Sequence, residues 1–105
     1  MTAAANPIGE TAVLIDATVF NHALGEPGPW RRGARRLLFE LAAGQGRGYV
    51  STEAVQEVVF HRLRRTGDRR SATANGRDIA QSFIVLDFDH EVLEASLGLI
   101  ERTAI

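Results

Sequence analysis

Short apolar runs alternate along this chain with longer segments in which apolar residues recur every three or four positions. The runs end at polar or turn-forming residues and have the length of strands that are buried in a parallel sheet. They cover 11–15 (TAVLI), 49–51 (YVS) and 83–86 (FIVL). The periodic segments predict amphipathic helices over 17–24, 30–43, 52–65 and 70–83, and a last helix that Asp87 or Asp89 caps.

Polar residues and glycines refine the helix boundaries. Ser51 or Thr52 is expected to cap the helix over 52–65. Glu53 then lies in the first turn, where the helix dipole favours an acid. Gly76 weakens the helical pattern of the segment that follows, because glycine is a poor helix former.

The apolar positions of the helices predict which side chains form the core. Trp30 is expected to anchor the start of its helix in the core. The helix over 52–65 is expected to bury Val55, Val58, Val59 and Leu63. The last helix is expected to bury Val92, Leu93, Ser96, Leu97, Leu99 and Ile100.

The order strand, two helices, strand, two helices, strand, helix predicts an α/β fold with a parallel sheet. Helices are expected on both faces of the sheet, which gives three layers. We expect TAVLI to be the central strand, with YVS and FIVL on either side of it. Residues 11–105 are expected to form one domain, and residues 1–10, which lack periodicity, a flexible leader.

Composition narrows the class of protein. The chain has no cysteine, which excludes a disulfide framework, a thiolate zinc site and a cysteine nucleophile. No apolar run approaches the roughly 20 residues that span a bilayer. Residues 1–10 lack the basic and apolar regions of a signal peptide. We therefore expect a cytoplasmic protein that does not associate with membranes.

The net charge of −1 conceals a strong pattern, because all 12 basic residues are arginine. Nine of them fall in two clusters: Arg31, Arg32, Arg35 and Arg36, and then Arg62, Arg64, Arg65, Arg69 and Arg70. Arginine suits bidentate contacts with phosphate, so the clusters are candidates for nucleic-acid binding. The alternative is that both clusters are solvated helix faces in a protein with an arginine-biased composition.

Asp16 is the first candidate for chemistry, because it directly follows the TAVLI strand. Ligands of open parallel sheets bind beyond the carboxyl ends of the strands. An Asp there can be a nucleophile, a ligand for a hard cation such as Mg²⁺, or only a helix cap. Aspartyl phosphatases usually have a second Asp two positions later, where this chain has Thr18. Thr18 either supports the carboxylate or is an ordinary helix residue.

Glu57 is the second candidate. A helical wheel places it opposite the apolar stripe of its helix, so it is either a solvent-facing residue or a ligand. His61 follows one turn later and can pair with it. The three histidines, His22, His61 and His90, lack the spacing of zinc ligands.

Taken together, VLIDATVF, HALGEPGP, the arginine-rich helix and STEAVQEVVFHRLRR resemble the PIN domain of VapC-like toxins. These toxins are the ribonuclease halves of bacterial type II toxin–antitoxin pairs. The resemblance covers residues 11–105. It implies a PIN-like, Rossmann-like fold in which Asp16 and Glu57 are the first two acids of a metal cluster. By the same resemblance Thr18 supports the first acid, and Glu57 lies against the carboxyl edge of the sheet.

The resemblance implies a metal-dependent endoribonuclease that hydrolyses RNA phosphodiester bonds with Mg²⁺ or Mn²⁺. A cognate antitoxin and a second copy of the chain are the expected protein partners. The residues expected to contact RNA phosphates are Arg62, Arg64, Arg65 and Arg69.

The chain departs from the family beyond residue 105, where the family has its third and fourth acids. We therefore expect an incomplete sheet, and a 105-residue form that is poorly active or inactive alone. The alternative function is a truncated or degenerate PIN module without activity that binds an antitoxin or dimerises. A weaker alternative is a receiver-like or phosphatase domain with Asp16 as phosphoacceptor.

Overall fold

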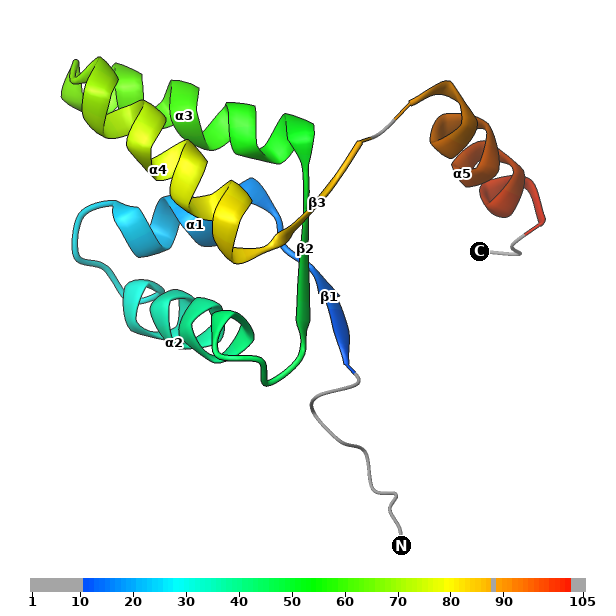
Figure 1. Ribbon diagram of the computed structural model, residues 1–105, viewed down its shortest axis with the longest axis horizontal. Helices are drawn as coiled ribbons and strands as arrows, with labels where there is room; N and C mark the ends of the chain where they lie inside the picture. Colours follow the sequence, from blue (N-terminus) through cyan, green and yellow to red (C-terminus); the bar gives the residue numbers. More distant parts are fainter. Residues whose placement is uncertain (1–10, 88, 103–105) are drawn as a thin grey trace, which may run out of the picture.

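The computed structural model describes residues 11–87 and 89–102, so the leader expected over 1–10 lies outside the described residues. The described residues form an α/β fold in which strands and helices follow the expected order (Figure 1). The elements are β1 (Ala12–Leu14), α1 (Ala17–Leu24), α2 (Arg31–Ala42), β2 (Arg47–Ser51), α3 (Thr52–Thr66), α4 (Arg69–Ser82), β3 (Ile84–Leu86) and α5 (His90–Arg102). No helix in these two ranges has the length and apolar character needed to cross a membrane.

The sheet is parallel, as expected, but the predicted strand order is wrong. The described strands are arranged β1-β2-β3, so β2 is central and β1, which contains the TAVLI run, lies at an edge. The chain moves one strand over at each crossover, in the same direction both times. The most apolar run therefore did not indicate the central strand, which is β2 and contains a glycine.

That glycine is Gly48, which is buried in β2. A Cβ at this position would lie 2.7 Å from Cδ1 of Phe83 and 3.1 Å from Cδ1 of Ile15. The side chains of Phe83 and Ile15 therefore pack against the backbone of the central strand at Gly48. Phe83 in turn makes an edge-on contact with Phe20 of α1, with ring centroids 5.7 Å apart.

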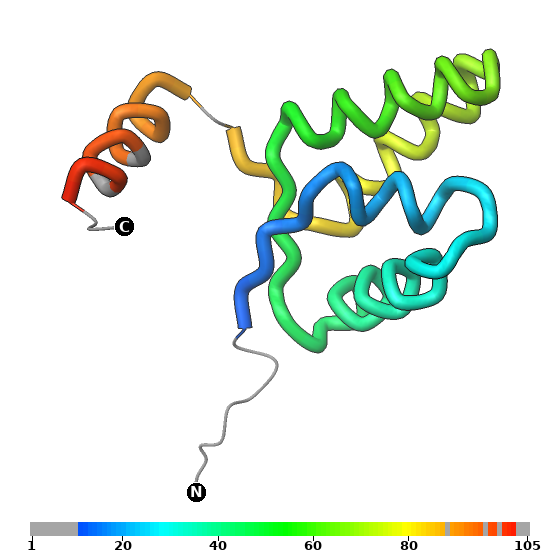
Figure 2. The backbone as a smooth tube through the Cα atoms, turned by 180° about the vertical axis from the view of Figure 1, so that it is seen from behind, coloured from blue at the N-terminus to red at the C-terminus, as the bar shows by residue number. Residues whose placement is uncertain are grey.

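Helices α1 to α4 cover one face of the sheet (Figures 1 and 2). Their core side chains meet those of the sheet, and the largest fully buried ones are Phe20, Ile15, Val50 and Val58. The three-layer expectation is wrong for the described residues. Right-handed crossovers that advance in one direction place both helix pairs on the same face.

The opposite face of the sheet is open among the described residues. Leu14, Tyr49 and Ile84 are register partners across the three strands, so their side chains form one row on this face. Leu14 is 61% exposed and Ile84 is 46% exposed. A buried parallel sheet normally has both faces covered, so this apolar row is a surface that lacks its usual neighbour.

Helix α5 stands apart from the other helices (Figures 1 and 2). The expectation that this helix buries its apolar face is wrong for Leu93, Leu97 and Ile100, which are all exposed. Val92 is half-buried, and the side chains of Ser96 and Leu99 lie outside the described residues. The periodicity correctly predicts that this segment is helical, but it does not show whether another element packs against the apolar face.

The expectation that Trp30 is buried is also wrong, because its side chain is 67% exposed. Helix α2 is held by other contacts. Leu41 is buried and packs in the core, and Nε of Arg35 donates a 2.8 Å hydrogen bond to the backbone carbonyl of Ala23 in α1. That bond satisfies a carbonyl near the carboxyl end of α1.

Two helical glycines give a matched test of the packing between α3 and α4. A Cβ on Gly76 of α4 would lie 2.7 Å from Cγ2 of Val59, whose branched side chain is stiff. A Cβ on Gly33 of α2 would meet no atom within 4 Å. We expect Gly76→Ala to lower the free energy of unfolding by about 1–3 kcal/mol. Gly33→Ala should raise it by about 0.5–1 kcal/mol, because alanine favours the helix. Urea denaturation measures both, and equal shifts would contradict the close approach of α3 and α4.

Candidate functional site

Asp16 lies where β1 gives way to α1. It follows Ile15, whose side chain is buried, and has extended backbone angles as the N-cap of α1. One carboxylate oxygen, Oδ1, accepts a 2.8 Å hydrogen bond from the backbone N–H of Ala17. The side chain is exposed, and a carboxylate has more than one acceptor site. The capping role is therefore observed, and it leaves acceptor capacity for a ligand.

Glu57 is exposed on α3, as the helical wheel predicted. Helix α3 begins directly after β2, and Oγ of Ser51 caps it by accepting a 3.0 Å bond from the N–H of Ala54. Because β1 and β2 are parallel neighbours, α1 and α3 leave the sheet from the same edge. The two helices then pack against each other.

A cavity of about 560 Å³ lies along this contact between α1 and α3. Its wall includes Thr18 of α1 and His61 of α3. Asp16 precedes Thr18 by two residues, and Glu57 precedes His61 by one helical turn. Neither candidate acid lines the cavity itself, and each precedes the first cavity-lining residue of its helix along the chain.

The structure divides the second arginine cluster. Arg62 and Arg65 line the cavity, whereas Arg64 and Arg69 are not among its lining residues. Nη2 of Arg65 lies 3.5 Å from Oε1 of Glu26, an exposed pair that contributes little to stability. Nε of Arg62 is buried and has no hydrogen-bond partner among the described residues.

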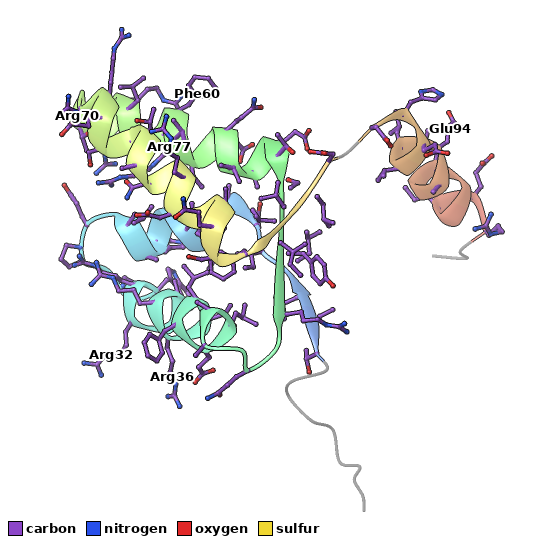
Figure 3. All side chains as sticks on the ribbon, in the orientation of Figure 1. Arg32, Arg36, Phe60, Arg70, Arg77 and Glu94 are labelled. Carbon is purple, nitrogen blue, oxygen red and sulfur yellow. The ribbon has the colours of Figure 1, made fainter. Side chains whose placement is uncertain are left out.

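Arginines of the first cluster either make contacts that hold α2 in place or face solvent, as Arg32, Arg35 and Arg36 show. Arg35 bonds to the backbone of α1, and Arg36 pairs with Glu40 one turn along the helix at 3.1 Å. Arg32 and Arg36 point outward from α2, and Arg70 points outward from the far end of α4 (Figure 3). These orientations favour the solvated-face interpretation for these positions.

Sequence reasoning considered His61 only as a partner of Glu57 and did not predict its place in the cavity wall. Its Nδ1 atom is buried without a hydrogen-bond partner in the described part of the chain, and no ion pair with Glu57 forms there. Desolvation, followed by the cations Arg65, Arg64 and Arg62, holds the pKa of His61 below its ordinary value. The sequence did contain a signal, because Glu57, His61 and Arg65 are spaced by four and share one face of α3.

The described acids and histidines do not include a group of three or more that could hold a metal ion. Asp87 lies at the end of β3, where its Oδ1 and the carbonyl of Leu86 both lie within reach of the Thr52 hydroxyl, at 3.0 and 3.3 Å. Asp89 caps α5 by accepting a bond from the N–H of Val92. Both residues therefore have evident structural roles.

Comparisons with models of protein families, with curated proteins and with solved structures found no match for this chain.

The double role of Asp16 can be separated by substitution. We expect Asp16→Ala to lower the free energy of unfolding by about 1 kcal/mol, because the cap of α1 is lost. Asp16→Asn should change it by only a few tenths of a kcal/mol, since asparagine caps helices equally well. Chemical denaturation checks this, and an equal loss in both variants would show that the charge rather than the cap stabilises α1.

The lowered pKa of His61 makes stability depend on pH. The unfolded chain binds a proton on this histidine near its ordinary pKa of about 6.5, whereas the folded chain binds it only at lower pH. The unfolding free energy should therefore fall as the pH drops through that window. His61→Gln should flatten this dependence between roughly pH 7.5 and 5.5. Urea unfolding across this range is the measurement, and an unchanged pH profile in the variant would argue against the desolvated position.

Proposed function

We propose that this chain is a metal-dependent endoribonuclease of the PIN class, similar to VapC-like toxins. The observation that carries the proposal is the origin of α1 and α3 at one edge of the sheet. Asp16 at the start of α1 and Glu57 in the second turn of α3 both precede residues that line a cavity with a cationic wall, and this supports the proposal. The edge beyond the carboxyl ends of parallel strands is the usual ligand site of such folds. The resemblance of residues 11–105 to the PIN domain supports the same function.

The donor set fits Mg²⁺ or Mn²⁺. Both metals prefer carboxylate, hydroxyl and water oxygens, and Mg²⁺ is commonly held by one or two carboxylates together with water and substrate phosphate. Asp16 and Glu57 are the residues that would hold the ion. When bound, it would supply an activated water and stabilise the charge on the leaving oxygen.

The protein itself contributes positioning and charge. The helix cap fixes the carboxylate of Asp16 relative to buried Ile15. Thr18, two residues after this acid, lines the cavity together with Arg62 and Arg65. Arg62 and Arg65 are placed to hold the phosphate backbone of an RNA strand that enters along α3. We assign Arg64 and Arg69 at most a general electrostatic contribution, because they lie outside the cavity wall.

A second candidate function is that of a binding module without activity, which associates with an antitoxin or with a second copy. The observation that favours it is the open sheet face with its apolar row of Leu14, Tyr49 and Ile84. Exposed apolar surfaces of this kind mark sites of protein association. Association would be consistent with either function, whereas cleavage distinguishes them.

Cleavage of single-stranded RNA by the 105-residue chain, followed with Mg²⁺, with Mn²⁺ and with EDTA, tests the proposal. We expect cleavage to require the metal, and Asp16→Asn and Glu57→Gln each to reduce the rate by about 100-fold or more, since each removes a carboxylate ligand. Glu53→Gln is the matched control, because Glu53 is an exposed acid one turn earlier on the same helix. Its rate should match that of the unmodified chain.

Cleavage that persists in EDTA, or that Asp16→Asn leaves unchanged, would contradict the proposal. Absence of cleavage in every condition would favour the binding module.

A further inference from the structure

The cavity between α1 and α3 contains more cationic and hydrogen-bonding groups than the fold requires. Its wall holds Arg62, Arg65 and two histidines, His22 and His61, against a single acid, Glu26. The last turn of a helix favours basic residues, which is sufficient to explain the positions of Arg64 and Arg65. It does not explain why the side chain of Arg62 is half-buried in the wall of the cavity.

Three residues of this wall, Asn21, His61 and Arg62, each have a buried polar atom without a hydrogen-bond partner among the described residues. Oδ1 of Asn21 is an acceptor, and the other two atoms are nitrogens that can donate. Nε of Arg62 is a donor, is buried, and has no partner among the described residues. A buried donor without a partner costs free energy that a bound acceptor recovers. Nδ1 of His61 is also buried without a hydrogen-bond partner among the described residues, and a histidine nitrogen that carries a proton is a donor. Two donors beside a second arginine form a site for an oxyanion.

The geometry of the side chains favours phosphate among oxyanions. Arginine presents a planar fork that matches the oxygens of phosphate or carboxylate, and phosphate offers further oxygens to other donors. Thr18 lies in the same wall and carries a hydroxyl, whereas the hydroxyl of Thr66 already donates a 2.8 Å bond to the carbonyl of Arg62. The carboxyl ends of α1 and α3 oppose an anion weakly. Their carbonyls, however, are partly satisfied by the N–H groups of Gly25 and Gly67.

We propose that this cavity is a phosphate-binding subsite, in which Arg62 and Arg65 hold a phosphate group with His61 as an additional donor. Glu26 competes for Arg65 through the 3.5 Å ion pair and so regulates how readily the site is filled. Its place in catalysis rests on the proposed function. Glu57 and His61 are one turn, about 6 Å, apart along α3, so a phosphate in the cavity would belong to the same stretch of RNA as one at the acids.

Inorganic phosphate is the first probe, titrated into the full chain in EDTA and followed by calorimetry and by the NMR signals of the His61 ring. We expect saturable binding that shifts these signals. Arg62→Gln and Arg65→Gln should each weaken it by about tenfold, the loss expected for a charge-assisted bond. Arg64→Gln and Arg69→Gln are matched controls, because they remove the same charge outside the cavity. Glu26→Gln should strengthen binding, since it releases Arg65.

Several outcomes would overturn the subsite. One is equal weakening by all four arginine variants, which indicates a general electrostatic effect. Another is binding that does not shift the His61 signals. Arg62→Lys guards against misfolding, because it keeps the charge and loses the fork, and wild-type affinity in this variant would also contradict the assignment.

A short single-stranded RNA without terminal phosphates is the second probe, and it distinguishes a phosphodiester from free phosphate. Competition between this RNA and inorganic phosphate, lost in Arg62→Gln but kept in Arg64→Gln, would assign the subsite to the RNA backbone. RNA that binds without displacing phosphate would overturn that assignment and leave a site for free phosphate or a phosphate monoester.

The subsite and the proposed function fail separately. Asp16→Asn should bind phosphate as the unmodified chain does, because Asp16 is not in the cavity wall. Phosphate binding without RNA cleavage would support the subsite and contradict the nuclease. Cleavage with phosphate binding that is insensitive to Arg62 and Arg65 would do the reverse.

Discussion

The parallel pairing of β1 with β2 is the constraint on which the rest of the structure depends. It makes α1 and α3 start at one edge of the sheet and run away from it side by side. Val50 in β2 and Val58 in α3 are fully buried, so the packing of α3 on the central strand fixes this geometry. This pairing determines the positions of Asp16, Glu57 and the cavity wall.

Two crossovers in the same direction also produce the least satisfied feature of the molecule. They place α1 to α4 on one face of the sheet and leave the row formed by Leu14, Tyr49 and Ile84 uncovered. At roughly 25 cal/mol per Å² of apolar surface, covering such a row is a substantial driving force. Helix α5 presents an apolar side of its own, through Leu93, Leu97 and Ile100. Both surfaces lack neighbours in the described residues, and association is the simplest way to bury them.

Local patterns predicted the helices and strands well, because caps and periodicity are local properties. Ser51 and Asp68 cap α3 and α4 in the structure, and Gly67 ends α3 in the left-handed conformation that favours glycine. The strand order was not predictable in this way, since it depends on pairing between distant segments. The central strand contains Gly48, which leaves room for the side chains of Phe83 and Ile15. Gly76 illustrates the same limit, because a residue that weakens a helix locally permits the close contact of α4 with Val59.

The site was predicted unevenly for a related reason. The position of Asp16 follows from a strand that ends in an acid, which is visible in one dimension. The arginine cluster gave no indication that Arg62 and Arg65 line a cavity while Arg64 lies outside it, because that division depends on the helix packed alongside. The number of charges in a sequence does not show which of them lie together in a desolvated space, and ligand binding depends on that grouping. The buried Nε of Arg62 is therefore stronger evidence for a bound ligand than the count of 12 arginines in the sequence.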